Sequence, residues 1–269
     1  MLASCTRSGA WRGGIVPYAT NPEDDVRVYY EVEGSGPAII LYAGFINAIR
    51  NWRDLGYVDG LRDDYTLVLV DPRGHGKSDA PDDPKQYVIT KMAADVQVVL
   101  DELGIDRAHL LGFSMGARAG YWLAHLAPER LITLMTIGGP VHPPTGHISP
   151  MIDAFERGPA ATADAWAATT ATMPDAVREQ ILENDTRPFI RMVQARREEA
   201  SVEEHLPTLE MPVLVYAGQD DVVYEEAKLT GQLIPQSTFV SIPDLDHNQS
   251  FYRSDLALPY IREFLAEFG

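Results

Sequence analysis

"HLLGFSMGARAG", residues 109–120, is the stretch that decides the fold. An apolar run typical of a strand leads into Gly112, Ser114 and Gly116, and an alanine-rich run typical of a helix leads out. A serine on so sharp a turn needs small neighbours, because side chains two residues to either side would collide. The turn would also place backbone N–H groups at a helix N-terminus, where negative charge is stabilised. We therefore interpret Ser114 as a candidate nucleophile rather than as a small residue in a flexible turn.

Strand-like and helix-like segments alternate around this turn. Short apolar runs closed by turn residues predict strands at residues 26–33, 38–42, 66–70, 108–112, 131–137, 213–216 and 238–242. Helical periodicity predicts helices at residues 90–103, 114–127 and 256–268. The alternation predicts an α/β fold, with a mostly parallel central sheet and helices on both faces.

One long segment interrupts the alternation. Residues 141–209 show no strand pattern, only alanine-rich, helix-prone runs separated by prolines, so they are predicted to form a small helical cap. The charged run at residues 196–199 (RREE) is interpreted as a solvated helix face. The core would then comprise residues 26–140 and 210–269, preceded by an N-terminal tail at residues 1–25.

The composition excludes several classes of protein. With 269 residues, 45% of them hydrophobic, the chain is long enough to bury a large core. A formal net charge of −17 would repel phosphate backbones and anionic lipids, so neither nucleic acid nor a membrane is an expected partner. Cys5 is the single cysteine, which excludes an internal disulfide or a multi-cysteine metal site and favours a cytoplasmic location. A small-molecule substrate is the expected partner, and a homodimer is left open.

A serine hydroxyl is a poor nucleophile unless a base removes its proton, so we look for a histidine late in the chain. His247 fits, because it follows the predicted strand 238–242 and precedes the last predicted helix. The other histidines lie in a turn, a strand, a helix or the predicted cap, where packing or exposure explains them better. His247 is therefore the candidate base.

A carboxylate must orient this imidazole and stabilise its protonated form. The strand-like run that begins at Val213 ends with Asp220 and Asp221, and both qualify. Successive side chains of an extended chain point in opposite directions, so only one of the two can face His247. The other is expected to cap the following helix.

The order serine, aspartate, histidine resembles that of the α/β-hydrolase superfamily, over nearly the whole chain from about Val26. In that family the acid usually stands three residues after the glycine that closes the strand, which implies Asp221, with Asp220 as the alternative. The stretch "LVDPRGHGKSDAP" also resembles a structural turn of the family, so neither Asp71 nor His75 is assigned a catalytic role. Asp71 is expected to fix the turn through backbone N–H groups.

The resemblance also implies an oxyanion loop at residues 43–46. Many relatives carry a histidine that braces this loop, and here Ala43 stands in its place. Gly44 permits close backbone approach to a bound carbonyl. The implied oxyanion donors are the backbone N–H groups of Met115 and Phe45.

The implied activity is that of a serine esterase, which needs neither a metal nor an organic cofactor. Because no charged side chain is assigned to the pocket, small to medium uncharged esters are the predicted substrates. A carbon–carbon bond hydrolase or a lactonase would use the same triad. A non-catalytic small-molecule receptor is the alternative from another class of protein. Apolar cap residues are the candidates for building the pocket: Met151, Ile152, Phe155, Trp166, Met173, Phe189 and Met192.

Overall fold

A single sheet organises the molecule. The computed structural model describes residues 17–143, 151–196 and 199–268. Within these ranges eight strands lie in the order β1-β2-β4-β3-β5-β6-β7-β8. The β1–β2 and β2–β4 pairs are antiparallel, and every pair from β4 to β8 is parallel. The strands are β1 (Tyr18–Thr20), β2 (Arg27–Gly34), β3 (Ala38–Tyr42), β4 (Thr66–Val70), β5 (Ala108–Phe113), β6 (Leu131–Ile137), β7 (Val213–Gly218) and β8 (Ser237–Ile242).

The predicted fold class is confirmed, and all seven predicted strands are present. Every residue of β5 and β7 is buried, which is why these segments read in the sequence as continuous apolar runs. Apolar residues on both faces of the sheet form one core cluster with the surrounding helices. The hydrophobic effect therefore fixes the register of the central strands.

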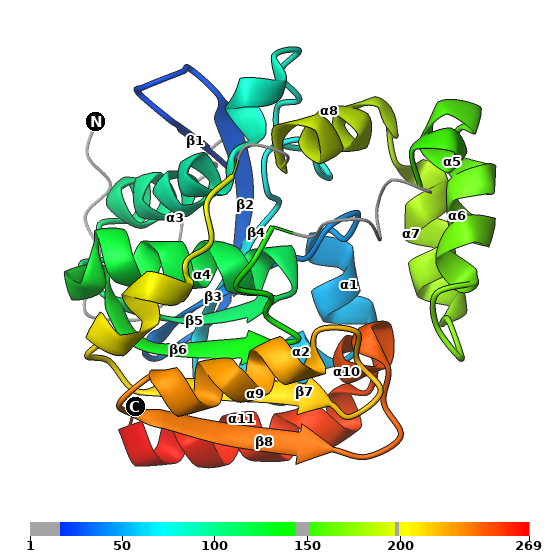
Figure 1. The fold of residues 1–269 in the computed structure, drawn as a ribbon. Helices are drawn as coiled ribbons and strands as arrows, with labels where there is room; N and C mark the ends of the chain where they lie inside the picture. The colour runs from blue at the N-terminus through cyan, green and yellow to red at the C-terminus, as the bar shows by residue number, and fades with distance from the viewer. Residues whose placement is uncertain (1–16, 144–150, 197–198, 269) are drawn as a thin grey trace.

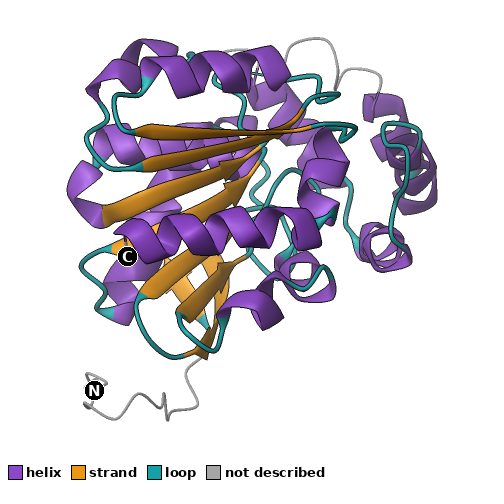
Figure 2. Ribbon diagram, turned by 90° about the horizontal axis from the view of Figure 1, so that it is seen from below, coloured by secondary structure: helices purple, strands orange, loops and turns teal. Residues whose placement is uncertain are grey.

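Helices cover both faces of the sheet (Figure 2). Right-handed crossovers that step the same way along a sheet lie on the same face, so α3 (Ile89–Leu103), α4 (Met115–Leu126) and α9 (Tyr224–Leu233) share one face. The other face is covered by α1 (Ile49–Asp54), α2 (Tyr57–Leu61) and α11 (Ser254–Phe268). Within the described residues, no helix combines the length and the apolar character that a bilayer span requires.

The described parts of the insertion between β6 and β7 are largely helical. Residues 144–150 lie outside the described ranges, as do residues 197–198 of the charged run 196–199. The insertion contains α5 (Met151–Arg157), α6 (Pro159–Ala167), α7 (Asp175–Glu183) and α8 (Arg187–Ala195). These helices lie beyond the carboxyl ends of the strands (Figure 1). The chain steps in opposite directions after β3 and after β5, which are neighbours. Loops at such a reversal separate and leave a crevice, the usual ligand site of an open α/β sheet.

The predicted N-terminal tail needs a correction. Residues 1–16 lie outside the described ranges, but β1 pairs with β2 and extends the sheet. Next to it, Asp24 binds the buried guanidinium of Arg73 at 2.8 Å. A strand of three residues gives too little periodicity to be recognised, and its stability comes from the neighbouring strand.

Candidate functional site

Ser114 lies on a strained turn at the carboxyl end of β5. Its backbone has φ 51° and ψ −110°, a conformation that side chains other than glycine rarely adopt. A Cβ at Gly112 would approach the backbone nitrogen of Ala117 to 2.6 Å, and one at Gly116 would approach the carbonyl oxygen of Tyr42 to 2.2 Å. The two glycines are thus required for the turn, as the sequence predicts.

His247 stands between the serine and a carboxylate. It is the first residue of α10 (His247–Tyr252), and its Nε2 lies 2.9 Å from Ser114 Oγ. Its Nδ1 lies 2.9 Å and 3.0 Å from the two carboxylate oxygens of Asp221. A proton on Nδ1 can be donated to Asp221, which leaves Nε2 to accept the proton of the serine hydroxyl. The arrangement matches the geometry of a nucleophile, a base and an orienting acid.

The environment of His247 sets its basicity. Burial alone would lower the pKa of the imidazole, but the charge of Asp221 and the hydrogen bond to it raise that pKa above its ordinary value. The ring also packs against Phe113, with 5.2 Å between ring centroids. The imidazole is therefore held in place and is a stronger base than histidine in water.

The structure separates the two adjacent aspartates. The Asp221 side chain is fully buried and faces His247, whereas Asp220 is exposed. The expected helix cap by the second acid is wrong, because no side chain caps α9. Asp221 instead accepts the N–H of Val223 at 2.9 Å, and this bond fixes the loop that leads into α9.

Two backbone N–H groups close to the Ser114 turn have no hydrogen-bond acceptor among the described residues. Met115 is the first residue of α4, so its N–H has no acceptor within the helix. Among the described residues, no hydrogen-bond acceptor is found for the N–H of Phe45. The absence of a side chain at Gly44 lets the loop that carries Phe45 lie close to the end of β5, since a Cβ there would lie 2.6 Å from the Phe113 ring. Both N–H groups are thus free to bind an oxyanion, and that of Met115 also lies at the positive end of the α4 dipole.

His75 braces the oxyanion loop, although the sequence suggested only a packing role. Its Nε2 accepts the N–H of Ile46 at 3.1 Å, and its Nδ1 lies 3.1 Å from the carbonyl oxygen of Arg73. Burial lowers the pKa of His75 to about 4, so the ring is neutral at pH 7 and can accept this bond. His75 thus supports the loop in which Ala43 replaces the bracing histidine of many relatives.

The cap holds the same peptide from the other side. Ile46 has a positive φ of 62°, which is costly for a β-branched residue. Its carbonyl oxygen accepts hydrogen bonds from Gln180 Nε2 at 3.1 Å and Asn184 Nδ2 at 2.9 Å. Since Gln180 lies on α7 and Asn184 directly follows it, the oxyanion loop is fixed by contacts from both the core and the cap.

The turn after β4 has the structural role that the sequence predicts. Asp71 accepts the N–H of Ile49 at 2.8 Å with one oxygen and that of Lys77 at 3.0 Å with the other. These bonds tie the end of β4 to the start of α1 and close the turn that carries His75.

Two residues near the site escaped the sequence analysis. Gly138 follows β6 with φ 55°, and a Cβ there would lie 2.9 Å from Asp221 Oδ2 and 3.1 Å from the His247 ring. The sequence signal for this residue is the glycine pair Gly138-Gly139, which directly follows a strand next to the one that carries the nucleophile.

The second residue is Arg196, which the sequence analysis placed on a solvated face but which is only 8% exposed. It continues the stripe of Phe189, Met192 and Val193 at helical spacing, a signal visible in the sequence.

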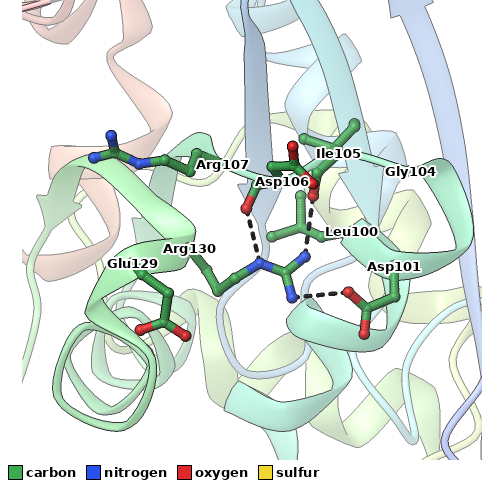
Figure 3. A pocket seen from close by; sticks show the side chains of 8 residues that line it. All are labelled: Leu100, Asp101, Gly104, Ile105, Asp106, Arg107, Glu129 and Arg130. Atoms are coloured by element: carbon green, nitrogen blue, oxygen red, sulfur yellow. Dashed lines mark hydrogen bonds and ion pairs between the residues drawn. The ribbon is translucent and has the colours of Figure 1, made fainter.

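A surface depression elsewhere on the molecule is a poor candidate. Figure 3 shows its lining: Leu100, Asp101, Gly104, Ile105, Asp106, Arg107, Glu129 and Arg130. These residues precede β5 and β6, so they lie at the opposite edge of the sheet from Ser114. The guanidinium of Arg130 already donates to the carbonyl oxygens of Ile105 and Asp106 and to the Asp101 carboxylate. The depression offers no comparable arrangement of reactive groups.

Comparison with known proteins agrees with the class that this fold and site define. A family model described as alpha/beta hydrolase fold matches residues 37–176, more than half of the chain. The protein belongs to the α/β-hydrolase family.

Individual relatives are hydrolases with different substrates. The chain is 36% identical to a putative carbamate hydrolase, RutD, of Azorhizobium caulinodans over 124 residues, which are 46% of this chain and 44% of that protein. It is 28% identical to epoxide hydrolase 1 of Siraitia grosvenorii over 188 residues, 65% of this chain and 58% of that protein. The chain thus spans about half the length of these relatives. A thermophilic esterase from Thermogutta terrifontis superposes with a TM-score of 0.82 and 25% identity, covering 94% of this chain and 98% of the esterase.

Proposed function

We propose that this protein is a serine hydrolase that cleaves small to medium carboxylic esters through an acyl-serine intermediate. The observation that carries the proposal is the 2.9 Å contact between Ser114 Oγ and His247 Nε2, with Asp221 on the other ring nitrogen. A serine at the turn speaks against epoxide hydrolysis, because related epoxide hydrolases use an aspartate there. A serine ester hydrolase needs the groups found at this site.

The reaction would proceed in two halves. Ser114 Oγ attacks the ester carbonyl carbon while its proton moves to His247 Nε2, and the N–H groups of Phe45 and Met115 bind the resulting oxyanion. Collapse breaks the bond to the alcohol, which leaves with the proton from His247. A water molecule then loses a proton to His247 and attacks the acyl-serine. His247 returns this proton to Ser114 Oγ as the acid leaves, which restores the serine. Each oxyanion donor would lower the barrier by roughly 3 kcal/mol.

The test combines turnover with labelling. Purified protein is incubated with p-nitrophenyl esters of graded acyl length, alongside Ser114→Ala. We expect turnover that the substitution abolishes, and a fluorophosphonate adduct that mass spectrometry maps to Ser114. Turnover that persists in Ser114→Ala would contradict the proposal.

The same assay separates the alternatives. Lactones are cyclic esters and would be opened by the same steps, so a lactone preference would refine the proposal. A receptor would bind ligands tightly and hydrolyse no ester, lactone or thioester.

A further inference from the structure

Arg196 brings a positive charge next to the proposed oxyanion site. It follows the last residue of α8 and is 8% exposed. The carbon of its guanidinium lies 4.2 Å from the centroid of the Phe45 ring. Its Nη2 lies 3.4 Å from Met115 Sδ. The guanidinium thus contacts the side chains of the two residues whose backbone N–H groups would hold the oxyanion.

No protein carboxylate in the described ranges neutralises this charge. Within residues 17–143, 151–196 and 199–268, no acidic side chain lies at ion-pair distance from Arg196, and its contact with Met115 is its sole hydrogen bond. Glu199, which is close in sequence, is occupied by Arg118 and by the N–H of Ile89. Burial and the charge of Arg118 lower the pKa of Arg196 to about 9, so it stays protonated at neutral pH.

A buried charge is costly when no opposite charge lies beside it, and Arg196 has no such partner among the described residues, so a bound anion would stabilise it. The guanidinium lies against Phe45, and most of its N–H groups have no acceptor among the described residues. A planar guanidinium can donate two parallel hydrogen bonds to the two oxygens of one carboxylate.

We propose that Arg196 binds a carboxylate on the substrate, so that the esters cleaved at Ser114 are anionic, with the carboxylate a few atoms from the scissile carbonyl. This inference rests on the proposed function and narrows its substrate class. It replaces the expectation of an uncharged ester, which depended on a pocket without a charged side chain. The contacts with Phe45 and Met115 limit the distance, since they place the charge against the side chains of the two residues that would supply the oxyanion donors.

The kinetic test compares matched esters. Monoethyl succinate, glutarate and adipate carry the carboxylate on the acyl side, and their diethyl esters are the neutral counterparts. O-acetylglycolate carries it on the alcohol side, with O-acetylglycolamide as its neutral counterpart. We expect kcat/KM for one of the two anionic series to exceed that for its neutral counterpart at least tenfold. Arg196→Met should lower the ratio of kcat/KM for the anionic ester to kcat/KM for its neutral counterpart by about 10- to 100-fold.

A control variant isolates the effect of position. Arg187→Met removes a guanidinium at the opposite end of α8, where Arg187 is paired with Asp185 and largely exposed. This variant should keep the ratio within about threefold of that of the parent protein, as expected for the loss of an exposed ion pair. Arg196→Lys keeps the charge without the planar fork and should lower the ratio by about three- to tenfold. If Arg196→Met does not fold, this variant decides, and an unchanged ratio overturns the proposal.

A binding test works without turnover. Glutarate is titrated by calorimetry into Ser114→Ala and into Ser114→Ala/Arg196→Met, with dimethyl glutarate as the neutral ligand. We expect glutarate binding to weaken at least tenfold in the double variant. If the parent protein hydrolyses no ester but glutarate binding still depends on Arg196, the proposed function is contradicted and the anion site is retained. Serine-dependent ester hydrolysis whose ratio Arg196→Met leaves unchanged would overturn the anion site alone.

Discussion

Gly138 contributes to the site through the side chain that it lacks. Its φ of 55° and the short approach of Asp221 and His247 leave no room for a Cβ. Gly138→Ala should push the Asp221–His247 pair apart and lower kcat by about 10²-fold or more, since small misplacements of a catalytic group are costly. Steady-state kinetics on the best ester found for the protein measure the effect.

Gly104 offers the matched control for this substitution. It ends α3 with φ 63°, and a Cβ there meets nothing within 4 Å. Gly104→Ala should therefore lose about 1 kcal/mol of stability to backbone strain, as Gly138→Ala does, but keep kcat. Equal losses of kcat in the two variants would show that strain, not contact with the pair, limits activity.

Asp221 and Asp220 differ in position and so should differ in effect. Asp221→Asn should lower kcat by about 10⁴-fold, because the imidazole loses its orienting acid, whereas exposed Asp220 should tolerate the same change. The pH profile adds a signature. The acid limb of kcat/KM should lie above pH 6.5 in the parent protein, because Asp221 outweighs burial in setting the His247 pKa. Asp221→Asn should move this limb to lower pH, and an unmoved limb would contradict the assignment.

At the scale of elements, α7 links the cap to the oxyanion loop. Gln180→Ala combined with Asn184→Ala removes both donors to the carbonyl oxygen of Ile46, whose positive φ then lacks support from the cap. We expect kcat to fall about tenfold or more, because an oxyanion donor must be held at the correct distance. Kinetics with a series of leaving groups would place the loss in the chemical step.

The same helix provides a control double variant. Glu179 and Glu183 lie on the exposed side of α7 and bind Arg50 of α1, so they also join cap and core. Glu179→Ala/Glu183→Ala should leave kcat nearly unchanged, since exposed ion pairs contribute little and these do not touch the loop. A similar loss in both double variants would mean that cap attachment in general, rather than the Ile46 contacts, matters.

The elements also show what the sequence could predict. Strands such as β5 and β7 were recognisable because they are buried on both faces and their apolar runs are uninterrupted. Ser114 and His247 were recognisable because the chemistry requires a serine and a base, and the order of strands and turns in this fold indicates where each would stand. Arg196 was misread because a charged residue next to other charged residues resembles a solvated face, and only the tertiary structure shows which surface covers it. Gly138 carries no functional group, so its role appears only when the distant residues Asp221 and His247 are placed beside it.

At the scale of the whole molecule, the site depends on strand order. β3 and β5 are neighbours, yet the chain leaves them in opposite directions, so the oxyanion loop and the Ser114 turn meet at the reversal. Asp221 and His247 reach the same edge from β7 and β8 because parallel strands end together. Because all of these groups are positioned by the same sheet, unfolding of the sheet removes them from the site together. The stability of the fold therefore limits activity.

Two buried histidines should make the fold sensitive to mild acid. Burial lowers the pKa of His75 and of His109 to about 4, against 6.5 for histidine in the unfolded chain. Between these values the unfolded chain binds protons that the native protein excludes, so stability is present above pH 6.5 and is lost as the pH falls. From pH 7 to pH 5 each should reduce the free energy of unfolding by about 2 kcal/mol.

His109 is the residue on which to test this, because it lies in β5 away from the reacting groups, with Nδ1 2.8 Å from Thr133 Oγ1. His109→Asn should reduce the loss of stability between pH 7 and pH 5 by about 2 kcal/mol, measured by urea unfolding at both values. His247 has a raised pKa and acts with the opposite sign, but it is present in both proteins and cancels in the comparison. If His109→Asn loses as much stability on acidification as the parent, proton exclusion at His109 does not govern the acid response of the fold.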